Sequence, residues 1–240
     1  MIQNLKILVF ILSLGSICLS LHACNKDDKP TPEPVEDARL YKKNESPLGL
    51  PVNKWIKEWE LFSMSRSCEE VTTLEAITIP GQNQSMVFLN GTVFTHGTAD
   101  VTIHEDQSIF VPIVSILYSV PTCINNNFQI QSGQDPQSFL SQTVTTIIDG
   151  VDIDFVKLDG KEVENVKNYR YQTEMFNLTP NVELQHCLLL CYPGGELKTM
   201  EQGFYIVIKP LSPGTHLLDL FAKDTVFGVE FSSRFNITVL

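Results

Sequence analysis

Acidic side chains gather in one short stretch of the chain, where they could act in pairs. Asp152 and Asp154 are two positions apart, so on a strand both would lie on the same face. Paired carboxylates bind Ca²⁺ or act as the acid and base of a hydrolase. The ordered Ca²⁺-loop pattern is absent, and the exposed face of a half-buried strand explains both aspartates equally well. We therefore treat Asp152 and Asp154 as weak catalytic candidates.

The remaining polar residues form no motif for metal binding or nucleophilic catalysis. His104, Glu105 and Asp106 bring three ligand types together, but neighbouring strand residues point to opposite faces, which favours a solvated turn. Gly-x-Ser-x-Gly, Ser-x-x-Lys and phosphate-binding glycine loops are missing. The sequence predicts no metal and no cofactor, and it favours a protein without catalytic activity while leaving that question open.

Residues 1–23 have the form of an export signal. Lys6 precedes an uncharged, mostly apolar run over Ile7–Leu21, which is too short for a membrane span and typical of a signal peptide. The run ends in Leu21-His22-Ala23-Cys24, which resembles the lipobox of bacterial lipoproteins. The resemblance implies cleavage before Cys24 and attachment of acyl chains such as palmitate to it. The membrane is then a partner through this lipid anchor.

The residues after Cys24 bear on location. Lys26-Asp27-Asp28 resembles the surface-export signal of lipoproteins in the Bacteroidota, and the alternative is a charged tether that stays hydrated. We expect a lipid-anchored protein of the outer membrane of a Gram-negative bacterium, facing either the cell surface or the periplasm. Asp224-Thr225-Val226 resembles a short O-glycosylation motif of the same bacteria, which makes Thr225 a candidate acceptor.

Composition limits the classes of partner. The 28 acidic and 17 basic residues give a formal net charge of -11, so the chain lacks the basic footprint that nucleic acid requires. Hydrophobic residues make up 43% of the chain, which is enough for a core. We predict a soluble globular domain that does not bind nucleic acid.

The folded domain is expected after a proline-rich tether over residues 24–51. A helix is predicted over Asn53–Met64, with Asn53 as its N-cap, because Trp55 and Trp59 recur at helical spacing. The two tryptophans are either a sugar-stacking platform or, as we favour, an aromatic face that packs on a sheet. A second helix is predicted between Asp135, the N-cap, and Gly150.

Most of residues 52–240 has the composition of strands, with turn residues between them. The predicted strands are Ala76–Pro80, Met86–Phe94, Ala99–His104, Ile109–Tyr118, Val151–Leu158, Tyr169–Leu178, Leu184–Cys191, Phe204–Lys209, His216–Ala222 and Phe231–Leu240. Asp159-Gly160 predicts a hairpin turn. The predicted fold is mainly β, a single Ig-like or jelly-roll-like β-sandwich with one or two accessory helices.

Four cysteines remain after removal of the signal and lipidation of Cys24. They are Cys68, Cys123, Cys187 and Cys191. An even number in an exported protein permits disulfides, with three possible connectivities, and buried free thiols are the alternative.

A series of short patterns along the chain resembles an uncharacterised family of secreted bacterial proteins. The patterns are Asn83–Thr92, Ile109–Ile113, Asp149-Gly150, Tyr169-Arg170, Gly203-Phe204 and Lys209–His216. The resemblance covers roughly Trp55–Leu240, and the chain departs from the family between Thr98 and Ser108. The family has no established activity, so the resemblance implies no catalytic residue.

These observations favour a binding or interaction module for glycan or for another envelope protein. A sandwich presents loops and faces, and no catalytic set is visible. The alternatives are a hydrolase of envelope or host polymers that uses carboxylates, and a purely structural lipoprotein. An exposed aromatic groove would support the binding module, and a flat face that points Asp152 and Asp154 into solvent would count against the hydrolase.

Overall fold

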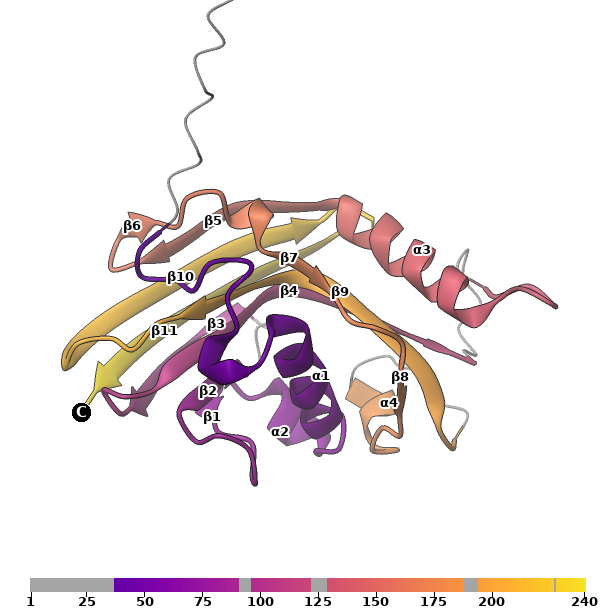
Figure 1. The fold of residues 1–240 in the computed structure, drawn as a ribbon, viewed down its shortest axis with the longest axis horizontal. Coiled ribbons are helices and arrows are strands. Elements are labelled where there is room, and N and C mark those ends of the chain that lie inside the picture. The colour runs from indigo at the N-terminus through magenta and orange to yellow at the C-terminus, as the bar shows by residue number, and fades with distance from the viewer. Residues whose placement is uncertain (1–36, 91–95, 122–128, 188–193, 227) are drawn as a thin grey trace, which may run out of the picture. The chain divides into compact units, whose positions relative to one another are not determined.

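Two β-sheets pack face to face in the computed structural model, which describes residues 37–90, 96–121, 129–187, 194–226 and 228–240 (Figure 1). Sheet A has the order β1 (Glu75–Ile77), β2 (Met86–Asn90), β4 (Ser108–Val120), β9 (Leu197–Ile208), β7 (Arg170–Gln172), and β8 (Phe176–Leu178) also pairs with β9. Sheet B has the order β3 (His96–Ile103), β11 (Val229–Val239), β10 (Gly214–Asp224), β5 (Val151–Leu158), β6 (Lys161–Glu162). The predicted mainly β sandwich with accessory helices is confirmed.

Alternating side chains of both sheets fill the space between them. Val101 and Ile103 of β3 are buried, whereas Thr102 between them is exposed, as the alternation predicts. The same core receives Leu218 and Leu220 from β10 and Val111 from β4. Both sheets are mixed, because β2 runs parallel to β4 and β3 runs parallel to β11.

Helix α1 (Val52–Ser63) covers the other face of sheet A (Figure 1). Trp55 is fully buried against Phe88, and the ring of Trp59 stacks on Phe88 at a centroid distance of 5.1 Å. The two tryptophans therefore belong to the core, as favoured above. The predicted cap is wrong: the helix begins at Val52, Pro51 occupies the N-cap position, and no side chain caps it.

Helix α3 (Pro136–Asp149) packs against the parts of β4 and β9 nearest Val120 and Leu197. Its N-cap is the predicted Asp135, whose carboxylate accepts the backbone N–H of Ser138 at 2.9 Å. Gly150 ends the helix as predicted. Leu140, Val144 and Ile147 form its buried side.

Replacement of Asp135 by alanine should lower the free energy of unfolding, because an N-terminal N–H of α3 loses its acceptor. Urea titration followed by circular dichroism measures this loss. Asp135→Asn is the matched control, since its amide oxygen still accepts the bond. An equal loss in both variants would show that charge, not capping, is what Asp135 contributes.

The chain packs on the sandwich from Asp37 onward, within the segment that the sequence assigned to the tether. Leu40 is buried in the main core and forms a β-bridge with Ile208 of β9. Arg39 donates a hydrogen bond from Nη1 to the carbonyl of Leu158 at 2.6 Å. Residues from Asp37 to Pro51 therefore form part of the folded unit.

The strand predicted over Leu184–Cys191 is wrong at its start, where the chain forms α4 (Leu184–Cys187). Asn181 begins the turn by accepting the backbone N–H of Glu183, and Leu184 is buried against Val71. Val71 lies on α2 (Cys68–Thr72), a short helix that the strand pattern did not predict. The rest of the predicted strand lies outside the described residues.

Cys68 at the start of α2 is in a disulfide, which excludes a free thiol at this position. The side chains of Cys123, Cys187 and Cys191 lie outside the described part of the chain.

Candidate functional site

The outer face of sheet B carries an ordered set of side chains that do not contribute to the core. Along β10, Asp219, Phe221 and Lys223 alternate with the buried Leu220 and Ala222. Cross-strand pairing aligns these positions with outward residues of β5, β11 and β3, in rows that run across the strands. The aromatic row is Phe155, Phe221, Ser232, His96, and the polar row is Lys157, Asp219, Arg234, Thr98.

The aromatic row begins with two half-buried phenylalanines. The rings of Phe155 and Phe221 are stacked, with centroids 6.0 Å apart and an interplanar angle of 22°. Lys157 Nζ lies 4.7 Å from the Phe155 centroid, and Lys223 Nζ lies 5.2 Å from the Phe221 centroid. Each lysine places its ammonium group against one ring. This cation–π attraction contributes about 0.5–1 kcal/mol at exposed sites. A ligand can displace such flexible side chains at little cost.

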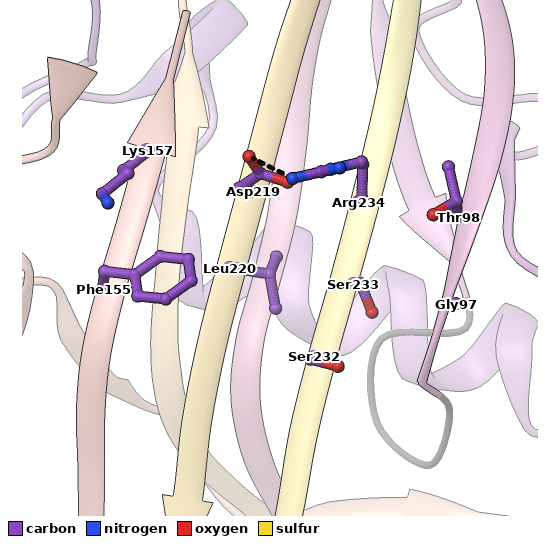
Figure 2. Close-up of a pocket in the computed structure, with 9 residues that line it drawn as sticks. All are labelled: Gly97, Thr98, Phe155, Lys157, Asp219, Leu220, Ser232, Ser233 and Arg234. Carbon is purple, nitrogen blue, oxygen red and sulfur yellow. Dashed lines mark hydrogen bonds and ion pairs between the residues drawn. The ribbon is translucent and has the colours of Figure 1, made fainter. Parts of the chain in front are cut away.

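The polar row is held by an ion pair between β11 and β10. Arg234 donates from Nε to Asp219 Oδ1 at 2.6 Å and from Nη2 to Oδ2 at 3.1 Å. The two parallel bonds fix the guanidinium in the plane of the carboxylate. Figure 2 shows Arg234 reaching across to Asp219, with Lys157 and Phe155 on the neighbouring strand.

An open depression of about 430 Å³ lies on this face, and its lining includes Phe155, Lys157, Asp219, Ser232 and Arg234. Phe221 stacks on Phe155 but does not line the depression. Ser232 contributes a hydroxyl, which shares a hydrogen bond with His96 Nδ1 at 2.8 Å. Apolar ring surface next to a few convergent polar groups is the usual composition of a small-ligand site. Such an arrangement can hold a flat ligand that is apolar on one side and carries hydroxyl groups at its edge.

The structure places Asp152 and Asp154 on β5 beside this depression but does not bring them to a common centre. Asp152 Oδ1 lies 3.3 Å from Lys167 Nζ, and Asp154 Oδ2 lies 3.7 Å from Lys223 Nζ. Both carboxylates are exposed. Among the described residues, no group of three His, Cys, Asp or Glu side chains could hold a metal ion. The convergence that a carboxylate hydrolase requires is therefore missing at these two residues.

His104, Glu105 and Asp106 form the predicted turn, between β3 and β4, and all three are exposed. Glu105 N donates to the Leu240 carbonyl at 3.1 Å, and Gln107 N donates to the His104 carbonyl at 3.0 Å. These bonds give the segment a structural explanation that needs no ligand.

A buried acidic cluster between α1 and sheet A was not predicted. Glu60 of α1 and Glu201 of β9 are both buried, and the hydroxyl of Tyr205 donates to Glu201 Oε1. Gly203 lies between Glu201 and Tyr205 on β9, and a Cβ at position 203 would be 2.6 Å from the Cβ of Ser115. The cluster therefore depends on a residue without a side chain at position 203.

Burial controls the protonation of this cluster. It raises the pKa of Glu60 well above the ordinary value, and the adjacent Glu201 carboxyl raises it further. Burial likewise raises the pKa of Glu201 to about 7, although hydrogen bonds from Tyr205, Ser115 and Glu60 act to lower it. The sequence did contain one signal, because Glu60 interrupts the apolar stripe formed by Val52 and Ile56.

Of the two predicted modification sites, Thr225 and Cys24, only Thr225 lies among the described residues. Thr225 is exposed in the turn between β10 and β11, where its hydroxyl donates to the Gly150 carbonyl at 2.6 Å. Cys24 and the signal residues lie outside the described residues. No helix among the described residues is long and apolar enough to cross a membrane.

Comparisons of the chain with family models, with curated proteins and with solved structures gave no match. The resemblance to a secreted bacterial family stays a prediction from the short patterns alone.

Proposed function

We propose that this protein is a lipid-anchored binding module of the bacterial envelope, and that the outer face of sheet B binds glycan. The observation that carries the proposal is the half-buried, stacked pair of Phe155 and Phe221. Phe155 lines a depression that it shares with the hydrogen-bonding side chains of Asp219, Ser232 and Arg234. Isolated apolar residues on a surface are normal, but a stacked pair aligned with the Asp219–Arg234 ion pair is an organised surface. This surface supports the binding hypothesis.

Sugars suit this surface because each ring has an apolar C–H side and a rim of hydroxyls. The C–H side stacks on the face of Phe155 or Phe221, and the hydroxyls reach Asp219, Arg234 and Ser232 in the neighbouring rows. Rows lie about 7 Å apart along the strands and their members about 4.8 Å apart across them, which fits adjacent rings of an oligosaccharide. The lipid anchor at Cys24 would hold this surface on the outer membrane.

The double variant Phe155→Ala/Phe221→Ala should weaken polysaccharide binding at least about tenfold, because both stacking surfaces are removed. Affinity electrophoresis measures this, using gels that contain bacterial or host polysaccharides. The protein is the mature chain with Cys24→Ser, which carries no lipid.

The matched control is Thr102→Ala/Thr238→Ala, a cross-strand pair on the same face at the far end of β3 and β11. It should bind as the unmodified protein does, and thermal unfolding should show that both double variants are folded. Unchanged binding in the phenylalanine variant would contradict the proposal. Capture of an envelope protein at the same face, with no polysaccharide bound, would replace glycan by protein as the partner.

A further inference from the structure

We infer that the glycan bound by the outer face of sheet B is uncharged, and that the face recognises it by ring stacking and by hydrogen bonds to its hydroxyl groups. This inference rests on the proposed function and names the class of ligand. It is drawn from the balance of charge along the polar row and from the charged side chains that lie around both rows.

The charges of the polar row cancel in adjacent pairs. Glu162 of β6 is the direct cross-strand partner of Lys157 and extends the row at the edge of the sheet. Asp219 and Arg234 follow on β10 and β11, where two parallel hydrogen bonds of 2.6 Å and 3.1 Å join them. The row ends at the neutral Thr98. Each base of the row therefore lies opposite an acid.

Acidic side chains lie on both sides of the two rows and disfavour an anionic ligand. On one side, Asp100 of β3 accepts a hydrogen bond from Asn236 Nδ2 at 2.6 Å. On the other side, Asp154 and Glu230 share one cation, with oxygens 3.7 Å and 3.4 Å from Lys223 Nζ. The chain as a whole carries a net charge of -11. A uronic acid or a sulfated sugar would meet like charges at these flanks, which is unfavourable.

The lysines over the two rings disfavour a cationic ligand. Lys157 Nζ lies 4.7 Å from the Phe155 centroid, and Lys223 Nζ lies 5.2 Å from the Phe221 centroid. A ring face is where an amino sugar would gain a cation–π contact, but here an ammonium group already occupies each face. A neutral sugar can displace these flexible side chains from the rings without bringing like charges together.

Hydroxyl groups of a neutral sugar meet partners that are already oriented. Ser232, Asp219 and Arg234 line the depression together with Phe155. The Ser232 hydroxyl shares a hydrogen bond of 2.8 Å with His96 Nδ1, and the ion pair fixes the Asp219 carboxylate. Each carboxylate oxygen has two lone pairs, so Asp219 can accept from a sugar hydroxyl while it stays bound to Arg234. An uncharged glycan therefore binds without breaking the ion pair.

The test compares neutral and charged forms of the same polymers. Biolayer interferometry measures binding of the mature Cys24→Ser protein to three backbones. They are dextran with its carboxymethyl and diethylaminoethyl derivatives, hydroxyethyl and carboxymethyl cellulose, and polygalacturonate in its fully methyl-esterified and free forms. At least one neutral polymer should bind, and its charged forms should bind about tenfold more weakly. A rise from about 50 to about 500 mM NaCl should change binding of the neutral polymer less than about twofold, because salt screens interactions between charges.

Glu162→Gln tests the charge balance directly, because it removes the acid opposite Lys157. Binding of the anionic form should become about two- to fivefold stronger, the effect of one exposed charge pair. Binding of the neutral form should not change, since Glu162 lies outside the lining of the depression. Glu69→Gln on α2 is the matched control, because it removes the same charge from an exposed position outside sheet B. It should change neither binding.

Tighter binding of a charged form than of its neutral counterpart, or loss of neutral binding in salt, would overturn the inference and leave the proposed function intact. Equal gains in Glu162→Gln and Glu69→Gln would overturn the assignment of charge balance to the polar row, because the net charge of the chain would explain them. Absence of binding to every polymer would overturn the proposed function together with the inference.

Discussion

The variant Glu201→Gln is expected to be more stable than the unmodified protein at pH 8, by on the order of 3 kcal/mol. The ordinary pKa of a glutamate is 4.5, and burial raises that of Glu201 to about 7. Each tenfold rise in proton affinity corresponds to about 1.36 kcal/mol of cost for the ionised form in the folded protein. Glutamine keeps the shape of the side chain and carries no charge at any pH.

The pH dependence follows from the same raised pKa. The pKa of Glu201 is higher in the folded than in the unfolded chain, so the folded chain binds more protons between pH 4.5 and about 7. The contribution of Glu201 to stability is therefore full below pH 4.5 and is lost as the pH rises through this window. Glu60, whose pKa is raised well above the ordinary value, extends the decline to higher pH. Glu201→Gln should reduce the slope, and the double variant with Glu60→Gln should reduce it further. The remaining slope belongs to other groups such as His216, whose pKa is raised, against the effect of burial, by its hydrogen bond to Asp159.

Urea unfolding at pH 5, 6, 7 and 8 measures this effect. Glu58→Gln on the same helix is the control, because Glu58 is only half-buried and accepts a bond from Gln82. It should leave the slope unchanged. Stability that rises between pH 5 and pH 7, or a Glu201→Gln variant less stable than the unmodified protein at pH 8, would contradict the assignment of a buried, protonated pair.

Trp55→Ala is expected to lower the free energy of unfolding by about 3–5 kcal/mol, the range for removing a large aromatic side chain from a core. Trp55 is fully buried between α1 and sheet A, and its Nε1 donates to the Pro47 carbonyl at 3.0 Å. The substitution leaves both a cavity beside Phe88 and a carbonyl without its donor. Glycan binding, normalised to the folded fraction, should be unchanged.

Thermal and urea unfolding measure this loss, and Lys54→Ala on the exposed side of α1 is the control, with an expected change within about 0.5 kcal/mol. A stable Trp55→Ala variant that no longer binds glycan would reverse the assignment. It would transfer the binding surface from sheet B to the tryptophans of α1.

The elements that were predicted best have strong local signals. The strand predicted over Val151–Leu158 matches β5 in both bounds, and the predicted turn Asp159-Gly160 leads to β6 with positive φ at both residues. Asp135 and Gly150 bracket α3 as predicted. In contrast, Leu184–Cys187 carries no comparable local signal for a helix or for a strand. Its helix is set by the Asn181 turn and by contact with α2, which lies far away in sequence.

The candidate site depends on contacts that no local pattern contains. Phe155 and Phe221 meet only because β5 pairs with β10 in one register, and a shift by one residue would turn one ring into the core. Glu60 and Glu201 meet because α1 packs across β9. The sequence could identify Asp152 and Asp154 as neighbours, but not that a separate lysine pairs with each of them.

The central claim is that the outer face of sheet B binds glycan, and chemical-shift mapping tests it most directly. Isotope-labelled mature protein with Cys24→Ser is titrated with an oligosaccharide prepared from a polysaccharide that it binds in affinity electrophoresis. The account predicts saturable shifts at Phe155, Lys157, Phe221 and Arg234, and none around Trp55 and Trp59. No shifts on sheet B, or shifts confined to α1 and sheet A, would contradict it.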